Sequence, residues 1–184
     1  MFFHDPDHAQ KYARIEEECR FLLRALPQDL LDTSSFIRII DSYIPGTRLR
    51  LRRMESPEGD PIAMKFGQKY QVTDMESHQT IMTNMYINEA EHQVLRTLGG
   101  LLINKRRYSH EFEQHQYSID VFEGSLAGLL LPEIEGRPGV DLSLLPVPGF
   151  ALLEVTDNPD FWGSNLAGLA AVELQKILSE YKVI

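Results

Sequence analysis

The sequence is poor in cysteine, in basic residues and in long apolar segments, and each shortage excludes a class of protein. Its 184 residues include one cysteine, Cys19, so an internal disulfide and a zinc knuckle built from cysteines are both excluded. Lys and Arg total 18 against 27 Asp and Glu, and the formal net charge is -9. A protein that coats duplex DNA needs a basic surface, so duplex nucleic acid is an unsuitable partner.

No apolar run approaches the roughly 20 residues that a membrane helix needs. The first residues, Met1 to Asp7, have neither the basic region nor the apolar core of a secretory signal. We therefore expect a soluble cytoplasmic protein without membrane contact, and the single cysteine agrees with a reducing compartment. The length favours a single domain over residues 1–184 and leaves the oligomeric state open, a homodimer included.

Alternation of apolar and polar residues with period two runs through most of the chain and predicts strands. The expected strands are 14–24, 35–44, 47–54, 61–70, 79–87, 102–109, 115–123, 128–136 and 150–156. The expected helices are 27–32, 88–98 and 164–181, of which the second is capped by Asn88. Many antiparallel strands with short links predict a mainly β protein (α+β), a barrel or a sandwich, with a few helices packed outside, a C-terminal one included.

Charged residues recur two positions apart on successive predicted strands, mostly as groups of one sign. Because side chains at positions i and i+2 of a strand share a face, each group projects to one side of the sheet. The groups are Glu16, Glu18 and Arg20; Arg48, Arg50 and Arg52; Lys105 and Arg107; and Glu133 and Glu135. Lys65 is followed four residues later by Lys69 on the same face, and Asp120 shares its face with Ser118. The opposite faces of these strands are largely apolar, as at Leu49 and Leu51.

Two arrangements explain this pattern. A half-buried sheet with a charged outer face is the ordinary explanation for any single strand. If the sheet instead closes with the charged faces inward, about eight strands enclose room for side chains and one small ligand. Closely packed buried charges are costly, and a polyanion with divalent cations would compensate both signs. The like-signed groups favour the closed arrangement, with Arg and Lys on phosphate oxygens and glutamates on Mg²⁺ or Mn²⁺.

Six motifs, in order, resemble the CYTH superfamily, also called triphosphate tunnel metalloenzymes. Glu16, Glu18 and Arg20 are similar to the family's Glu-x-Glu-x-Lys, with arginine in the place of lysine. The other motifs are GTRLRLRR with Arg48 and Arg50, AMKF with Lys65, NKRRY with Lys105 and Arg107, IDVFEGSLAGLLLPEIE with Asp120, Glu133 and Glu135, and EVTDNPDF followed by NLA. The resemblance covers nearly all of residues 14–170 and implies an eight-stranded antiparallel closed barrel, the triphosphate tunnel.

The resemblance also implies a function: metal-dependent hydrolysis of a triphosphate, inorganic or carried by a small organic molecule. It implies three catalytic residues, Arg20, Glu16 and Glu18. It implies that phosphate is bound by Arg48, Arg50, Lys65, Lys105 and Arg107. It implies that Mg²⁺ or Mn²⁺ is held by Glu16, Glu18, Glu133, Glu135 and Asp120. Inorganic triphosphate is the preferred substrate, because no base-specific pocket can be read from the sequence.

One departure from the family keeps other functions open. Many members carry Arg-x-Glu-x-Glu on the strand where this chain has Thr80, Met82 and Asn84, so one carboxylate pair is missing. The missing pair motivates a non-catalytic module that binds polyphosphate or a nucleotide. A third hypothesis is an adenylyl cyclase that makes cyclic AMP, an activity that the superfamily includes. Phe161 and Trp162 are expected to anchor the start of the last helix in the core.

Overall fold

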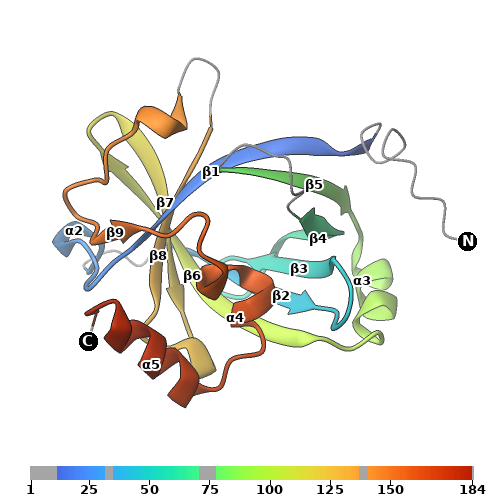
Figure 1. The fold of residues 1–184 in the computed structure, drawn as a ribbon. Coiled ribbons are helices and arrows are strands. Elements are labelled where there is room, and N and C mark those ends of the chain that lie inside the picture. The colour runs from blue at the N-terminus through green and yellow to red at the C-terminus, as the bar shows by residue number, and fades with distance from the viewer. Residues whose placement is uncertain (1–11, 32–34, 71–77, 137–140, 184) are drawn as a thin grey trace, which may run out of the picture.

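A computed structural model describes residues 12–31, 35–70, 78–136 and 141–183 (Figure 1). Within these ranges the chain forms nine strands joined in one antiparallel sheet. The strands are β1 (Arg14–Leu22), β2 (Ile37–Tyr43), β3 (Leu49–Glu55), β4 (Pro61–Tyr70), β5 (Gln79–Tyr86), β6 (Leu101–Phe112), β7 (His115–Phe122), β8 (Leu130–Glu135) and β9 (Leu153–Glu154).

The sheet closes into a barrel. Its strand order is β5-β4-β3-β2-β6-β7-β8-β1-β9, and an additional pairing joins β5 to β1. Eight strands therefore form the antiparallel barrel and β9 pairs with β1 outside it. The eight-stranded barrel expected from the sequence is confirmed, and the sandwich is wrong because β5 pairs with β1 and closes the sheet.

Strand β1 closes the barrel because different parts of it pair with different strands. Its residues 14–17 pair with β5, residues 18–20 with β8, and residues 21–22 with β9. In Figure 1 this long strand runs along one side of the barrel, next to β5 at one end and near β9 at the other. The acidic N-terminal motif thus lies at the point where the first and last strands of the barrel meet.

The helices lie outside the barrel, with α3 and α5 on opposite sides (Figure 1). They are α2 (Gln28–Leu31), α3 (Glu89–Arg96), α4 (Gly163–Leu166) and α5 (Ala171–Glu180), and 3₁₀ turns occur at Gly124–Leu126, Leu142–Leu144 and Pro159–Phe161. The predicted cap of α3 is confirmed: the Asn88 side chain accepts from the Glu91 amide at 3.0 Å. No helix in the described ranges has the length and apolar character to cross a membrane.

The prediction of one continuous helix over 164–181 is wrong. The chain leaves the helix after Leu166, passes Gly168, and is extended at Ala170, where φ is -76° and ψ is 154°. Gly168 favours the break because glycine has low helix propensity. Helix α5 then begins at Ala171, where the Glu173 carboxylate accepts a hydrogen bond from the Ala170 amide at 2.8 Å. The apolar stripe survives the break, because Leu166, Leu174 and Leu178 are all buried.

The main apolar core joins the C-terminal elements to the inward faces of the strands, because its members Ile103 and Leu131 share those faces with Lys105 and Glu133. Its buried members include Leu126 and Leu129 beside β8, Phe161 before α4, and Leu174 and Leu178 of α5. A second cluster with Cys19 and Phe21 packs on the other side of β1. The second cluster thus covers outward strand faces, whereas on the inward faces the main core lies beside the charged groups.

Candidate anion site in the barrel

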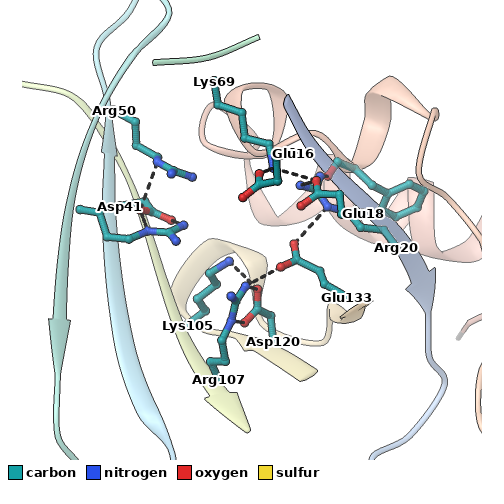
Figure 2. Close-up of polar contacts among 12 residues, drawn as sticks. Glu16, Glu18, Arg20, Asp41, Arg50, Lys69, Lys105, Arg107, Asp120 and Glu133 are labelled. Atoms are coloured by element: carbon teal, nitrogen blue, oxygen red, sulfur yellow. Dashed lines mark hydrogen bonds and ion pairs between the residues drawn. The ribbon is translucent and has the colours of Figure 1, made fainter. Parts of the chain in front are cut away.

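A cavity of about 520 Å³ occupies the interior of the barrel. Among the described residues, nine basic and five acidic side chains line it. The basic ones are Arg14, Arg20, Arg48, Arg50, Arg52, Lys65, Lys69, Lys105 and Arg107; the acidic ones are Glu16, Glu18, Asp41, Glu133 and Glu135. Figure 2 shows many of these side chains pointing toward a common space from different strands. The interior is therefore rich in positive charge although the whole chain is negative.

The acidic side of the cavity is built by β1 and β8. Their pairing places Glu18 opposite Glu135 and Arg20 opposite Glu133. The Arg20 guanidinium donates to Glu133 Oε1 at 3.0 Å and to Glu18 Oε1 at 2.5 Å, so it lies between the two carboxylates (Figure 2). A third bond, from Nη1 to the carbonyl of Phe161 at 3.3 Å, fixes its orientation.

Lys69 of β4 contacts two carboxylates of β1, one of which is Glu18. Its Nζ lies 2.6 Å from Glu16 Oε2 and 2.8 Å from Glu18 Oε1. Burial alone would raise the pKa of Glu18, but the nearby charges of Arg20 and Lys69 outweigh it and hold that pKa below its usual value. Glu18 is therefore ionised in the fold and shared by two cations.

The basic side is built by β2 and β3. Asp41, which is 1% exposed, accepts two bonds from Arg52 at 2.6 and 2.7 Å, and its carboxylate lies 3.8 Å from Arg50 Nε. Burial opposes ionisation of Asp41, yet the charges of Arg52 and Arg50 lower its pKa. Asp41 thus positions Arg52 and Arg50 of β3. Most of the N–H donors of Arg50 remain available in the cavity.

Asp120 holds a third pair of cations. It is fully buried and accepts from Lys105 Nζ at 2.5 Å and twice from Arg107 at 2.7 Å. Arg107 also donates to Glu133 Oε2 at 2.5 Å, which connects this group to the acidic side (Figure 2). Burial lowers the pKa of Lys105 despite its bond to Asp120. Lys105 and Arg107 line the cavity, whereas Asp120 lies behind them.

Two predicted phosphate-binding residues have no carboxylate partner among the described residues. The Arg48 guanidinium lies 4.0 Å from the ring centre of Tyr70, and Lys65 Nζ lies 4.9 Å from that of Tyr86. Aromatic faces attract cations without cancelling their charge. Arg48 and Lys65 therefore remain available to an anion, together with Arg50.

The structure thus brings nearly all the predicted site residues to one cavity. The catalytic candidates Glu16, Glu18 and Arg20 line it, as do all five phosphate-binding candidates and the metal candidates Glu133 and Glu135. Asp120 is the exception, because it is fully buried beneath the side chains of Lys105 and Arg107. Thr80, Met82 and Asn84 also line the cavity, so the β5 wall carries no carboxylate at these positions.

The sequence pattern assigns no role in the site to three contributors: Asp41, Lys69 and Trp162. Lys69 is expected on the charged face with Lys65, whereas Asp41 is the single charged residue on its face of β2. Phe161 is buried in the core as expected, whereas Trp162 faces the cavity and donates from Nε1 to the carbonyl of Thr156 at 3.3 Å.

A second group of potential ligands lies at the β1–β9 pairing. The ligand atoms of Cys19, His78 and Glu154 lie within 4.8 Å of one another. Ordinary contacts explain all three: the Cys19 thiol lies 3.7 Å from the Leu142 carbonyl, and His78 Nε2 is 2.8 Å from Glu154 Oε1. Burial and the Glu154 charge raise the pKa of Cys19 to about 12, so its thiol is protonated at neutral pH.

No protein-family model and no curated protein sequence match this chain. Solved structures do match. The crystal structure of the inorganic triphosphatase NE1496 has a TM-score of 0.55 and 20% identity, and the match covers 83% of this chain and 93% of that one. A second structure, of the hypothetical protein NE1496, has a TM-score of 0.56 and 21% identity, over 84% and 99% of the two chains. At these identities the likeness shows the fold alone, and it agrees with the eight-stranded antiparallel closed barrel expected from the sequence.

Proposed function

We propose that the barrel binds a triphosphate-bearing small molecule in its cavity and hydrolyses it with the help of Mg²⁺ or Mn²⁺. The observation that carries this proposal is the excess of basic side chains in the interior of a chain whose net charge is -9. Buried like charges repel unless a ligand compensates them, and a phosphate chain carries several negative charges on oxygens that accept hydrogen bonds.

Arg48, Arg50 and Lys65 would make the main contacts with the phosphate chain, because their donors are the least engaged. Lys105 and Arg107 would add to them, each held in place by Asp120. Arg20 would face the transferred phosphoryl group, since its three contacts fix its plane before any ligand arrives. Positioned positive charge of this kind supplies much of the catalysis in phosphoryl transfer.

The carboxylates suit one divalent cation. Glu16, Glu18 and Glu135 lie on the paired strands β1 and β8 and offer the hard oxygen ligands that Mg²⁺ and Mn²⁺ prefer. Glu133 and Asp120 were predicted ligands as well, but both oxygens of each are engaged by arginine or lysine, so we assign them to positioning these cations. When bound, the metal would polarise phosphoryl oxygens.

The likeness to the inorganic triphosphatase NE1496 agrees with this proposal at the level of the fold. Inorganic triphosphate is the substrate we test first. Phosphate release should be measured with Mg²⁺ and with Mn²⁺, for inorganic triphosphate and for ATP, with cyclic AMP assayed as a possible product. Absence of release from every triphosphate tested would contradict hydrolysis, and cyclic AMP formation would favour a cyclase.

A matched pair of arginine variants tests the site. Arg50→Ala removes a guanidinium from the cavity face of β3, whereas Arg53→Ala removes one from the outer face, where Arg53 pairs with Glu55 and Glu89. We expect Arg50→Ala to weaken triphosphate binding by roughly tenfold or more, since hydrogen bonds to charged groups are worth about 1.5–3 kcal/mol. Arg53→Ala should leave the dissociation constant, measured by calorimetry, unchanged, and equal losses would contradict the assigned site.

A non-catalytic binding module is the second candidate, favoured by the neutral β5 wall at Thr80, Met82 and Asn84. In that case calorimetry would show tight triphosphate binding while no phosphate is released. The same two measurements therefore separate an enzyme from a binding protein.

A further inference from the structure

Lys69 bridges the two carboxylates that the proposed function assigns to a metal. Its ammonium nitrogen lies within hydrogen-bond distance of Glu16 Oε2 and Glu18 Oε1, at 2.6 and 2.8 Å. All three side chains are largely shielded from solvent, with exposures of 19%, 15% and 9%. The contact is therefore a partly buried bridge with two acceptors, which is stronger than an ordinary surface ion pair.

The neutral β5 wall explains how Lys69 reaches these carboxylates. Strand β5 lies between β4 and β1, and its Met82 is the register partner of Lys69 while its Thr80 is that of Glu16. Since neither Thr80 nor Met82 carries a charge, the lysine side chain passes over β5 to the acids of β1. An acid at either β5 position would offer Lys69 a nearer partner.

We infer that Lys69 is an internal cation that occupies the place of a divalent metal between Glu16 and Glu18, and that a metal must displace it to bind. This inference rests on the proposed function, because it concerns the same carboxylates. Lys69 holds Glu16 Oε2 and Glu18 Oε1, so a divalent ion that bridges these same two oxygens must take the place of the ammonium. Metal affinity in the free protein is therefore lowered by the strength of the Lys69 bridge.

Displacement also has a second effect. The freed ammonium of Lys69 remains in the cavity, where it adds one positive charge to those available for phosphate. Metal binding then strengthens anion binding, and by thermodynamic linkage the anion strengthens metal binding to the same degree. Metal and triphosphate should accordingly bind together more tightly than either binds alone.

Two lysine variants on one strand test the competition. Mn²⁺ binding is measured by calorimetry without triphosphate for the wild type, for Lys69→Met and for Lys65→Met. Both variants remove one positive charge from the same face of β4, but Lys65 lies against Tyr86 and does not contact Glu16 or Glu18. We expect Lys69→Met to bind Mn²⁺ roughly ten- to hundredfold more tightly than the wild type, and more tightly than Lys65→Met. Equal affinities of the two variants would overturn the inference, because the gain would then reflect net charge alone.

Two further measurements guard against a variant that fails to fold. Lys69→Gln keeps a donor but loses the charge, and it should also bind Mn²⁺ more tightly than Lys65→Gln. In the wild type, the acetylation rate of Lys69 should rise when Mn²⁺ is added, since displacement exposes the amine, while that of Lys65 stays constant. An unchanged Lys69 rate with Mn²⁺ bound would contradict displacement.

The result is separable from the proposed function, because Mn²⁺ binding is measured without substrate. If Lys69→Met binds Mn²⁺ more tightly but the protein releases no phosphate, the displacement of Lys69 by metal stands and the proposed hydrolysis is wrong. If the protein hydrolyses triphosphate but all variants bind Mn²⁺ equally well, the proposed hydrolysis stands and the displacement of Lys69 is wrong.

Discussion

Glu133 lies between two guanidinium groups, one from Arg20 and one from Arg107. Burial alone would raise its pKa, but these two charges outweigh it and hold the pKa well below the usual 4.5. The fold therefore favours the ionised form of Glu133. Its contribution to the free energy of unfolding is fully present above about pH 4.5 and is lost as the pH falls through the lowered pKa.

Glu133→Gln should lower the free energy of unfolding at pH 7 by roughly 1.5–3 kcal/mol, because two buried guanidinium groups lose their shared anion while Arg20 keeps Glu18 and Arg107 keeps Asp120. The difference from the wild type should shrink as the pH falls below about 4.5, because the unfolded chain then binds a proton at Glu133 while the folded protein does not until its lowered pKa is reached. Urea unfolding between neutral and acid pH measures both effects.

Glu123→Gln is the matched control for this prediction. Glu123 pairs with Arg106 at 2.9 Å on the outside of the barrel, where both side chains are about one-third exposed. Exposed ion pairs contribute about 0–1 kcal/mol, so this variant should unfold almost like the wild type. Similar losses for the two variants would contradict the special position of Glu133.

At the scale of elements, α5 stabilises the barrel by packing its apolar face on the main core. Leu174→Ala should lower the free energy of unfolding by about 2–5 kcal/mol, because Leu174 is fully buried in the main core. Val172→Ala, on the exposed face of the same helix, should change it little. Urea unfolding compares the two, and a Leu174→Ala loss no larger than that of Val172→Ala would show that the helix is not docked.

The strands and their faces could be predicted from the sequence because both follow from period two. Arg48, Arg50 and Lys65 line the cavity as that pattern indicates. The break between α4 and α5 could not be predicted from apolar spacing, because Leu166 and Leu174 keep the same stripe on both sides of Gly168. A local loss of helix propensity changes the backbone without changing which face is apolar.

Contacts across the cavity could not be predicted either. Lys69 and Glu16 are 53 residues apart, and they meet only because β5 pairs with β1. Asp41 is the single charged residue on its face of β2, so no repeat identifies it, although it pairs with Arg52 and Arg50. Alternation determines which side of a strand a residue occupies, whereas the order of strands around the barrel determines its partners.

At the scale of the whole molecule, charge is sorted between the inside and the outside. The net charge is -9, yet the cavity is lined by more basic than acidic residues. Triphosphate affinity should therefore fall as salt rises, by about tenfold or more between about 0.05 and 0.5 M NaCl, because salt screens the attraction between the anion and the cavity. Calorimetry across this range measures it, and an affinity independent of salt would contradict binding through charge.

The change of partners along β1 has a consequence for opening motions. Glu16, Glu18 and Arg20 lie on β1, which joins β5 to β8 and so forms the seam of the barrel. Separation of β1 from β5 or β8 would therefore disrupt the acidic side of the cavity. A molecule held inside bridges both sides of the seam. Binding of this molecule should slow the deuterium exchange of the amide hydrogens of β1 and β5. The slowing should be larger there than in the β3–β4 hairpin, which is not part of the seam.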